Sequence, residues 1–259
     1  MTLIGIISLI GGGLVAGILA GFLGIGGGTI LVPLIVTLGY LPKQAVATSS
    51  LAILISATAG SWQNWRMGYF NPRKVISLGI TAIFTTQIGV ILANLFPPHL
   101  LLLGFGLLLL LNIYLLSLRQ TLNKHNSEAI APSSIKATLA RLATGGAAGL
   151  IAGLFGLGGG VILVPLQVML LGETLKTAIQ ISLGVIIITA IFACTGHAIA
   201  GNVLFVQGLY LGLGGLLGVQ ISTRLLPKLA EQTVSILFRG FLSLLSVYVF
   251  WQAWQAYLR

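Results

Sequence analysis

A glycine-rich stretch of fourteen residues occurs twice in this chain, each time inside a long apolar run. GFLGIGGGTILVPL at 21–34 returns as GLFGLGGGVILVPL at 153–166, with ten positions identical at an offset of 132. The chain is therefore a duplicated unit. In lipid, a broken helix is tolerated only where its freed backbone groups face protein or a water-filled cavity. The two copies thus indicate functional positions, expected to be the two halves of one site.

The composition places the whole chain in a lipid bilayer. Of its 259 residues, 57% are hydrophobic and 6% are charged, whereas soluble domains carry about 25% charged residues. The longest polar stretch is 119–136, so no extramembrane domain is expected. The basic residues give a net charge of +10 but are scattered singly between apolar runs. This pattern is typical of membrane-topology signals and not of nucleic-acid binding.

Apolar runs between charges and prolines predict an all-α polytopic membrane protein with two matching halves. Each half has one glycine-broken segment followed by three segments long enough to span a bilayer. The first repeat is expected over 1–118 and the second over 139–259, with a cytoplasmic linker at 119–138. The eight segments are expected at about 3–38, 44–65, 75–96 and 99–118, then at 142–171, 174–200, 204–226 and 232–257.

The distribution of Lys and Arg predicts how these segments cross, because cytoplasmic loops collect basic residues. If each broken segment crosses once, the loop charges divide eight to four between the two sides. If each enters and leaves on one side, they divide ten to two, with Lys43 and Arg259 alone opposite the majority. The second arrangement is favoured. It predicts a re-entrant helical hairpin in each half, inverted repeats and both termini outside the cell.

The length of the hairpin arms agrees with a re-entrant geometry. The segment from Arg141 to Gly153 is about 12 residues, or ~18 Å of helix, and so reaches only about the middle of a ~30 Å hydrocarbon core. The first arm of the first half, 3–20, is longer. For that half, a full crossing stays open as the alternative.

The glycines are expected to form turns from which a helix begins at once. Positive φ angles at Gly24 and 26–28, and at Gly156 and 158–160, would let backbone N–H groups approach a ligand. Helices starting near Thr29 and Val161 would present unpaired N–H groups and a positive dipole end. Two such ends entering from opposite faces predict an anion site near the bilayer centre. The alternative is that the glycines only permit close helix packing.

The doubled pattern GxxGxGGGxxxxP, followed in the first copy by AVATSSLAI at 45–53, resembles the sulfite exporter TauE/SafE family of membrane permeases. The resemblance covers essentially the whole chain. It implies a multi-pass protein of the bacterial plasma (inner) membrane that transports small organic or sulfur-containing anions, such as sulfite, sulfoacetate or another sulfonate. The choice of anion, the direction of transport, coupling to protons or other ions and the oligomeric state stay open.

Polar residues inside the apolar segments are the candidates for lining the path. At the offset of 132, Ser50 corresponds to Ser182, and both offer a hydroxyl donor to an oxyanion. Interhelical hydrogen bonding is the alternative role for each of them. The residues expected to bind substrate are Gly26, Gly27, Gly28, Thr29, Ser49, Ser50, Gly158, Gly159, Gly160, Gln180 and Ser182.

A second group of polar residues is placed less directly. Asn64 corresponds to His197, and Gln87 to Gln220, after a one-residue gap. The His197 imidazole could titrate during transport, since the reference pKa of histidine is about 6.5. Arg239 could attract anions or extend its side chain to the interface. The secondary candidates are Thr48, Asn64, Gln87, His197, Gln220 and Arg239.

The acidic residues Glu128, Glu173 and Glu231 all fall in loops or at segment ends. An anion path would exclude carboxylates, because a buried negative charge repels the substrate. The single cysteine, Cys194, allows no intramolecular disulfide, and no metal or cofactor is expected. Familiar protease and ATP-binding motifs are missing, so the chain is not expected to be an enzyme. A passive anion channel, or an intramembrane enzyme, is the alternative to a permease.

Overall fold

The computed structural model describes residues 3–123 and 134–258, and within these ranges the chain is helical apart from short connections. The helices are α1 (Leu3–Leu23), α2 (Gly28–Thr37), α3 (Pro42–Arg66), α4 (Pro72–Leu95), α5 (Pro98–Asn123), α6 (Ser134–Phe155), α7 (Gly160–Leu170), α8 (Leu175–Ile199), α9 (Phe205–Leu225), a short 3-10 turn η1 (Leu226–Lys228) and α10 (Glu231–Leu258).

The lengths and composition of these helices are those of a multi-pass membrane protein. In the described ranges, seven helices are long and apolar enough to cross a bilayer, namely α1, α3, α4, α6, α8, α9 and α10. Helices α2 and α7 are apolar but only 10 and 11 residues long. Large apolar side chains such as Phe84 on α4 and Leu244 on α10 are more than 70% exposed on the outer surface. Lipid tails are as apolar as these side chains, so their exposure fits a bilayer.

The helices repeat in order and in length, with one shift of register. Gly28, which begins α2, corresponds to Gly160, which begins α7, at the offset of 132. Helix α7 is one residue longer than α2, and from there on the offset is 133, so that Gly68 after α3 corresponds to Gly201 after α8. Equivalent positions in the later helices are therefore displaced by one residue from the simple alignment.

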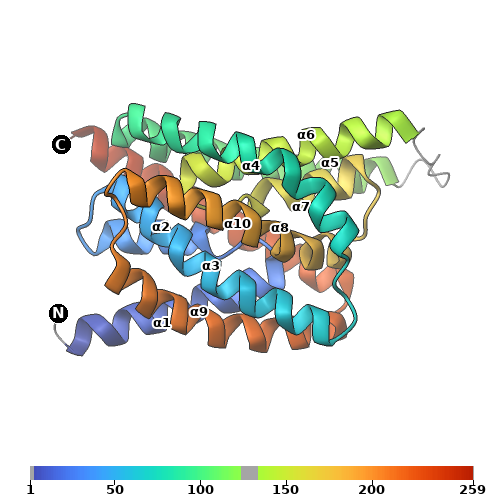
Figure 1. Ribbon diagram of the computed structural model, residues 1–259, viewed down its shortest axis with the longest axis horizontal. Coiled ribbons are helices and arrows are strands. Elements are labelled where there is room, and N and C mark those ends of the chain that lie inside the picture. The colour runs from blue at the N-terminus through green and yellow to red at the C-terminus, as the bar shows by residue number, and fades with distance from the viewer. Residues whose placement is uncertain (1–2, 124–133, 259) are drawn as a thin grey trace.

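The two halves exchange their first helices. Helix α1 packs along α9 of the second half, and α6 packs along α4 of the first half, on opposite edges of the molecule (Figure 1). Helices α3 and α8 lie in contact between these pairs, and α5 packs against α10. The start of α1 and the end of α10 lie at the same end of the molecule (Figure 1). Neither half buries its glycine break without the other.

Glycines also serve as packing surfaces, outside the breaks. A Cβ atom at Gly13 would lie 2.1 Å from the Leu211 carbonyl oxygen, where α1 crosses α9. The equivalent Gly145 on α6 would place its Cβ 2.0 Å from the Leu78 carbonyl oxygen on α4. Small residues thus let these helix backbones approach closely, as is common in membranes.

The expectation that the first arm of the second hairpin is short is wrong. Helix α6 begins at Ser134, before Lys136 and Arg141, and is 22 residues long, and α1 is 21 residues long. Charged residues do not end a helix when its terminal turns are polar and exposed, and Arg141 is exposed. The same extension makes both ends of the expected linker at 119–138 helical, while 124–133, with Glu128, lies outside the described residues.

Candidate functional site

Each glycine break is a tight turn that leads directly into a short helix. Gly24, Gly26 and Gly27 have φ angles of 67°, 78° and 77°, and the equivalent Gly156, Gly158 and Gly159 have 65°, 72° and 79°. L-residues with side chains rarely adopt these angles. Gly27 and Gly159 have the left-handed conformation, and each directly precedes the first residue of a helix, α2 or α7. The expected turns are confirmed.

Gly28 and Gly160 differ from this expectation, because they are the first helical residues of α2 and α7 and do not have positive φ. Their lack of a side chain instead allows a close approach between the two breaks. A Cβ at Gly28 would lie 2.5 Å from the Gly156 carbonyl oxygen, and a Cβ at Gly160 would lie 2.1 Å from the Gly24 carbonyl oxygen. The two breaks therefore press against each other, and the starts of α2 and α7 meet at one buried place.

Serine hydroxyl groups connect each break to the opposite half. Ser49 Oγ on α3 donates to the Gly156 carbonyl at 2.8 Å, and Ser182 Oγ on α8 donates to the Gly24 carbonyl at 2.8 Å. Both oxygens are also within hydrogen-bond distance of a carbonyl in their own helix. Each serine is fully buried.

Ser50, which pairs with Ser182 at the offset of 132, does not make the contact equivalent to that of Ser182. Ser50 Oγ donates to Val46 in its own helix at 3.0 Å. The extra residue in α7 makes Ser49 the equivalent of Ser182, and a shift of one residue turns a side chain by about 100° around a helix. Ser49, also among the expected binding residues, is thus the one that reaches the second break.

Three residues at the meeting point are absent from the sequence-based expectation. Thr189 Oγ1 donates to the Gly158 carbonyl at 2.8 Å. Ile53 and Ile186 cover the breaks, since a Cβ at Gly158 would lie 3.1 Å from Ile53 Cγ2 and 2.8 Å from Ile186 Cγ2. Ile53 corresponds to Ile186, and Thr189 to the buried Ser56, at the offset of 133. Aligning all of α8 with α3 at the offset of 133 would have identified both pairs of equivalent residues from the sequence.

Thr29, Asn64 and His197, all among the expected residues, carry buried polar atoms with no hydrogen-bond partner among the described residues. These atoms are Thr29 Oγ1, on the second residue of α2, both side-chain polar atoms of Asn64, and His197 Nδ1. All three side chains are buried. The equivalent of Asn64, His197, has Nε2 3.0 Å from the Gly153 carbonyl oxygen, near the second break. Buried polar groups left without a partner are costly, and a ligand is one explanation for them.

The other expected residues lie elsewhere in the fold. Thr48 Oγ1 accepts from the Leu204 N–H at the start of α9 at 3.1 Å, and Gln87 Nε2 donates to the Phe192 carbonyl on α8 at 2.9 Å. Gln180 is buried on α8, while Gln220 on α9 and Arg239 on α10 are partly exposed. The hydrogen bonds of Thr48 and Gln87 thus join α3 to α9 and α4 to α8, and do not involve the glycine turns.

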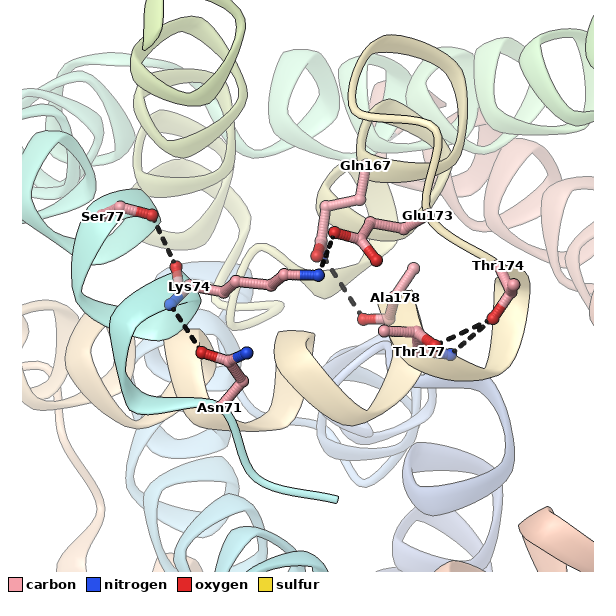
Figure 2. A network of polar contacts seen from close by, with 8 residues as sticks. All are labelled: Asn71, Lys74, Ser77, Gln167, Glu173, Thr174, Thr177 and Ala178. Carbon is pink, nitrogen blue, oxygen red and sulfur yellow. Dashed lines mark hydrogen bonds and ion pairs between the residues drawn. The ribbon is translucent and has the colours of Figure 1, made fainter. Parts of the chain in front are cut away.

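The carboxylates within the described ranges lie in the connection before α8 and at the start of α10. Glu173 forms an ion pair with Lys74, with Oε1 2.5 Å from Nζ (Figure 2). Glu231 Oε1 accepts from the Leu175 N–H at 2.9 Å. In the part of the chain that the structure describes, no three His, Cys, Asp or Glu side chains form a group that could hold a metal ion.

Comparison with known proteins identifies similar membrane transporters. The family model described as sulfite exporter TauE/SafE matches residues 9–249. The probable membrane transporter protein YunE of Bacillus subtilis is 24% identical over 247 residues, covering 88% of this chain and 90% of that protein. The probable membrane transporter protein MJ0441 of Methanocaldococcus jannaschii is 26% identical over 236 residues, covering 83% and 86%. No solved structure matches the chain.

Proposed function

This chain belongs to the sulfite exporter TauE/SafE family of membrane transporters, and we propose that it is a permease for a small organic or sulfur-containing anion such as sulfite, sulfoacetate or another sulfonate. The anion binds where the two glycine breaks meet, between the starts of α2 and α7. The observation that carries this proposal is the contact of the two breaks beside the buried Thr29 hydroxyl, which has no partner among the described residues.

The negative charge of the proposed ligand follows from the groups where the two glycine breaks meet. The first N–H groups of a helix have no intrahelical partner, and each helix start carries roughly half a positive charge. Neither Gly27 nor Gly159 can supply a side-chain cap. An oxyanion would accept hydrogen bonds from these N–H groups and from Thr29 Oγ1. The two carboxylates of the described ranges lie in the connection before α8 and at the start of α10, and leave this positive potential unopposed.

In this proposal Ser49 and Ser182 position the site. Their hydroxyl groups donate to the Gly156 and Gly24 carbonyl oxygens, which would otherwise direct partial negative charge into a buried space. Satisfying these carbonyls holds the turns in place and favours an anion beside them. The same bonds link the breaks to α3 and α8, so movement of these helices is transmitted to the site.

The mechanism we propose is alternating access by two inverted repeats, each with a re-entrant hairpin formed by α1 and α2 or by α6 and α7. The exchange of α1 and α6 between the halves supports it. So do equivalent contacts 133 residues apart, since Lys43 Nζ donates to the Asn94 carbonyl and Lys176 Nζ to the Pro227 carbonyl. Ile53 and Ile186 cover the breaks, so the helices must move to admit an anion, which favours a carrier over a passive channel.

Counterflow in proteoliposomes tests the function. Vesicles loaded with unlabelled sulfite or sulfoacetate should accumulate the labelled anion only when they contain the protein. Voltage-driven anion currents without counterflow would indicate a channel instead. If no small anion moves and the purified protein hydrolyses a substrate, the permease proposal is wrong.

A further inference from the structure

A second polar site lies at the far end of α7, away from the glycine breaks. It is a cavity of about 260 Å³ lined by the start of α4, the first half of α6, the end of α7 and the connection that follows α7. One water occupies ~30 Å³ of the liquid, so the cavity can hold an anion of several heavy atoms. Its lining residues are Lys74, Ser77, Leu78, Ala137, Arg141, Gln167, Leu171 and Glu173.

The charges that line the cavity favour an anion. Lys74 and Arg141 are cationic, and Glu173 is the one carboxylate among the lining residues. Lys74 Nζ lies 2.5 Å from Glu173 Oε1, with the two side chains 39% and 17% exposed. The pair is therefore within reach of water and of ions, and an incoming anion can compete with Glu173 for the ammonium group.

Gln167 offers a hydrogen-bond acceptor, so a ligand with a hydrogen-bond donor would fit this cavity best. Its side chain is fully buried, and Nε2 donates to the Ala178 carbonyl at 3.3 Å (Figure 2). This bond directs the amide nitrogen to α8 and leaves Oε1 as an acceptor with no partner among the described residues. A ligand that carried both an anionic group and a hydroxyl or amino group would satisfy the cations and this acceptor together.

In the other half of the molecule, two uncharged residues form the contact equivalent to the link between Lys74 and Glu173. At the offset of 133, Lys74 corresponds to Gln207 and Glu173 to Tyr40. Gln207 Nε2 donates to Tyr40 Oη at 3.2 Å. In both halves the link joins the first turn of α4 or α9 to the connection before α8 or α3. A neutral hydrogen bond suffices to hold this link, so the charges of Lys74 and Glu173 call for an additional role.

We propose that this cavity is an entry site for the transported anion, in which an oxyanion with a hydrogen-bond donor binds Lys74 and Arg141, displaces Glu173 from Lys74 and donates to Gln167 Oε1. This inference rests on the proposed permease function. Hydrogensulfite and hydroxyl- or amino-substituted sulfonates have the required groups. The site acts at one end of the molecule only, because its counterpart at Tyr40 and Gln207 has no ionised groups.

Equilibrium binding to the purified protein tests the proposal. Calorimetric titrations compare 2-hydroxyethanesulfonate with ethanesulfonate, which lacks the hydroxyl group. They are made with a Thr29→Val protein, in which the central site between the breaks is weakened. In this background the hydroxylated sulfonate should bind about fivefold more tightly, as expected for one net hydrogen bond. Gln167→Met should remove this difference between the two ligands.

Charge substitutions in the same background complete the test. Lys74→Gln should weaken binding about tenfold and Glu173→Gln should tighten it about fivefold, the size expected for partly exposed charges. Arg73→Gln removes the same charge one residue away from an exposed position and should change affinity by less than about twofold. If Thr29→Val abolishes all binding, or if Arg73→Gln acts like Lys74→Gln, the entry site is wrong, while counterflow by the wild type would still support the permease.

Discussion

Ser182 Oγ on α8 donates a 2.8 Å hydrogen bond to the carbonyl oxygen of Gly24, which lies 158 residues earlier in the chain. Ser49 makes the equivalent bond to Gly156 in the opposite direction. The pair shows how the duplicated halves depend on each other, because each supplies the donor that satisfies the broken backbone of the other. A buried carbonyl without such a partner would destabilise the fold.

Replacing either serine should therefore lower the stability of the protein. Ser182→Ala or Ser49→Ala leaves a buried carbonyl without its partner, with an expected loss of about 1–3 kcal/mol. This corresponds to a fall in Tm of roughly 2–4 °C for each kcal/mol in a chain of this size. Thermal unfolding in detergent measures it. Ser50→Ala is the matched control, since Ser50 bonds only within α3, and an equal fall in Tm for this variant would contradict the assignment.

Adding one methyl group at the meeting point should block transport. A Cβ at Gly160 would lie 2.1 Å from the Gly24 carbonyl oxygen, so Gly160→Ala must push the two breaks apart. Anion counterflow should fall at least about tenfold, because misplacement by about 1 Å can lower rates 100-fold. Gly11→Ala in α1 is the control, since its Cβ would meet nothing within 4 Å. Normal counterflow by Gly160→Ala would show that the breaks need not touch.

Much of the fold could be predicted from the sequence, because prolines and charges bound its apolar runs. The segment expected at 44–65 is α3, Pro42–Arg66, and the glycine turns lie where the doubled motif places them. The choice between Ser49 and Ser50 does not follow from the offset of 132 that relates the two glycine motifs. It depends on one extra residue in α7, and a shift by one residue turns a side chain about 100° around the helix. The contact between Gly28 and Gly156 arises only when the two halves pack.

Thr29→Val should weaken binding of the transported anion and leave the fold intact. Valine occupies the equivalent position 161 in the second break, so the methyl groups fit this environment, and the change removes the buried hydroxyl. Losing one hydrogen bond to an anion should raise the KM for uptake about fivefold. The measurement is initial uptake against anion concentration. If the KM is unchanged and only Tm rises, Thr29 Oγ1 does not contact the substrate.

Labelling of single cysteines should place equivalent loops on opposite sides of the membrane. Leu41, before α3, and Thr174, before α8, are equivalent at the offset of 133, and both are exposed. In a Cys194→Ala background, a membrane-impermeant thiol reagent added to intact cells should label Leu41→Cys and not Thr174→Cys. The reason is that inverted repeats place equivalent points on opposite faces, and the majority of Lys and Arg residues on the side of Thr174 makes that side cytoplasmic. Labelling of both variants in permeabilised cells controls for reactivity. Labelling of both in intact cells would exclude inverted repeats and with them the proposed alternation.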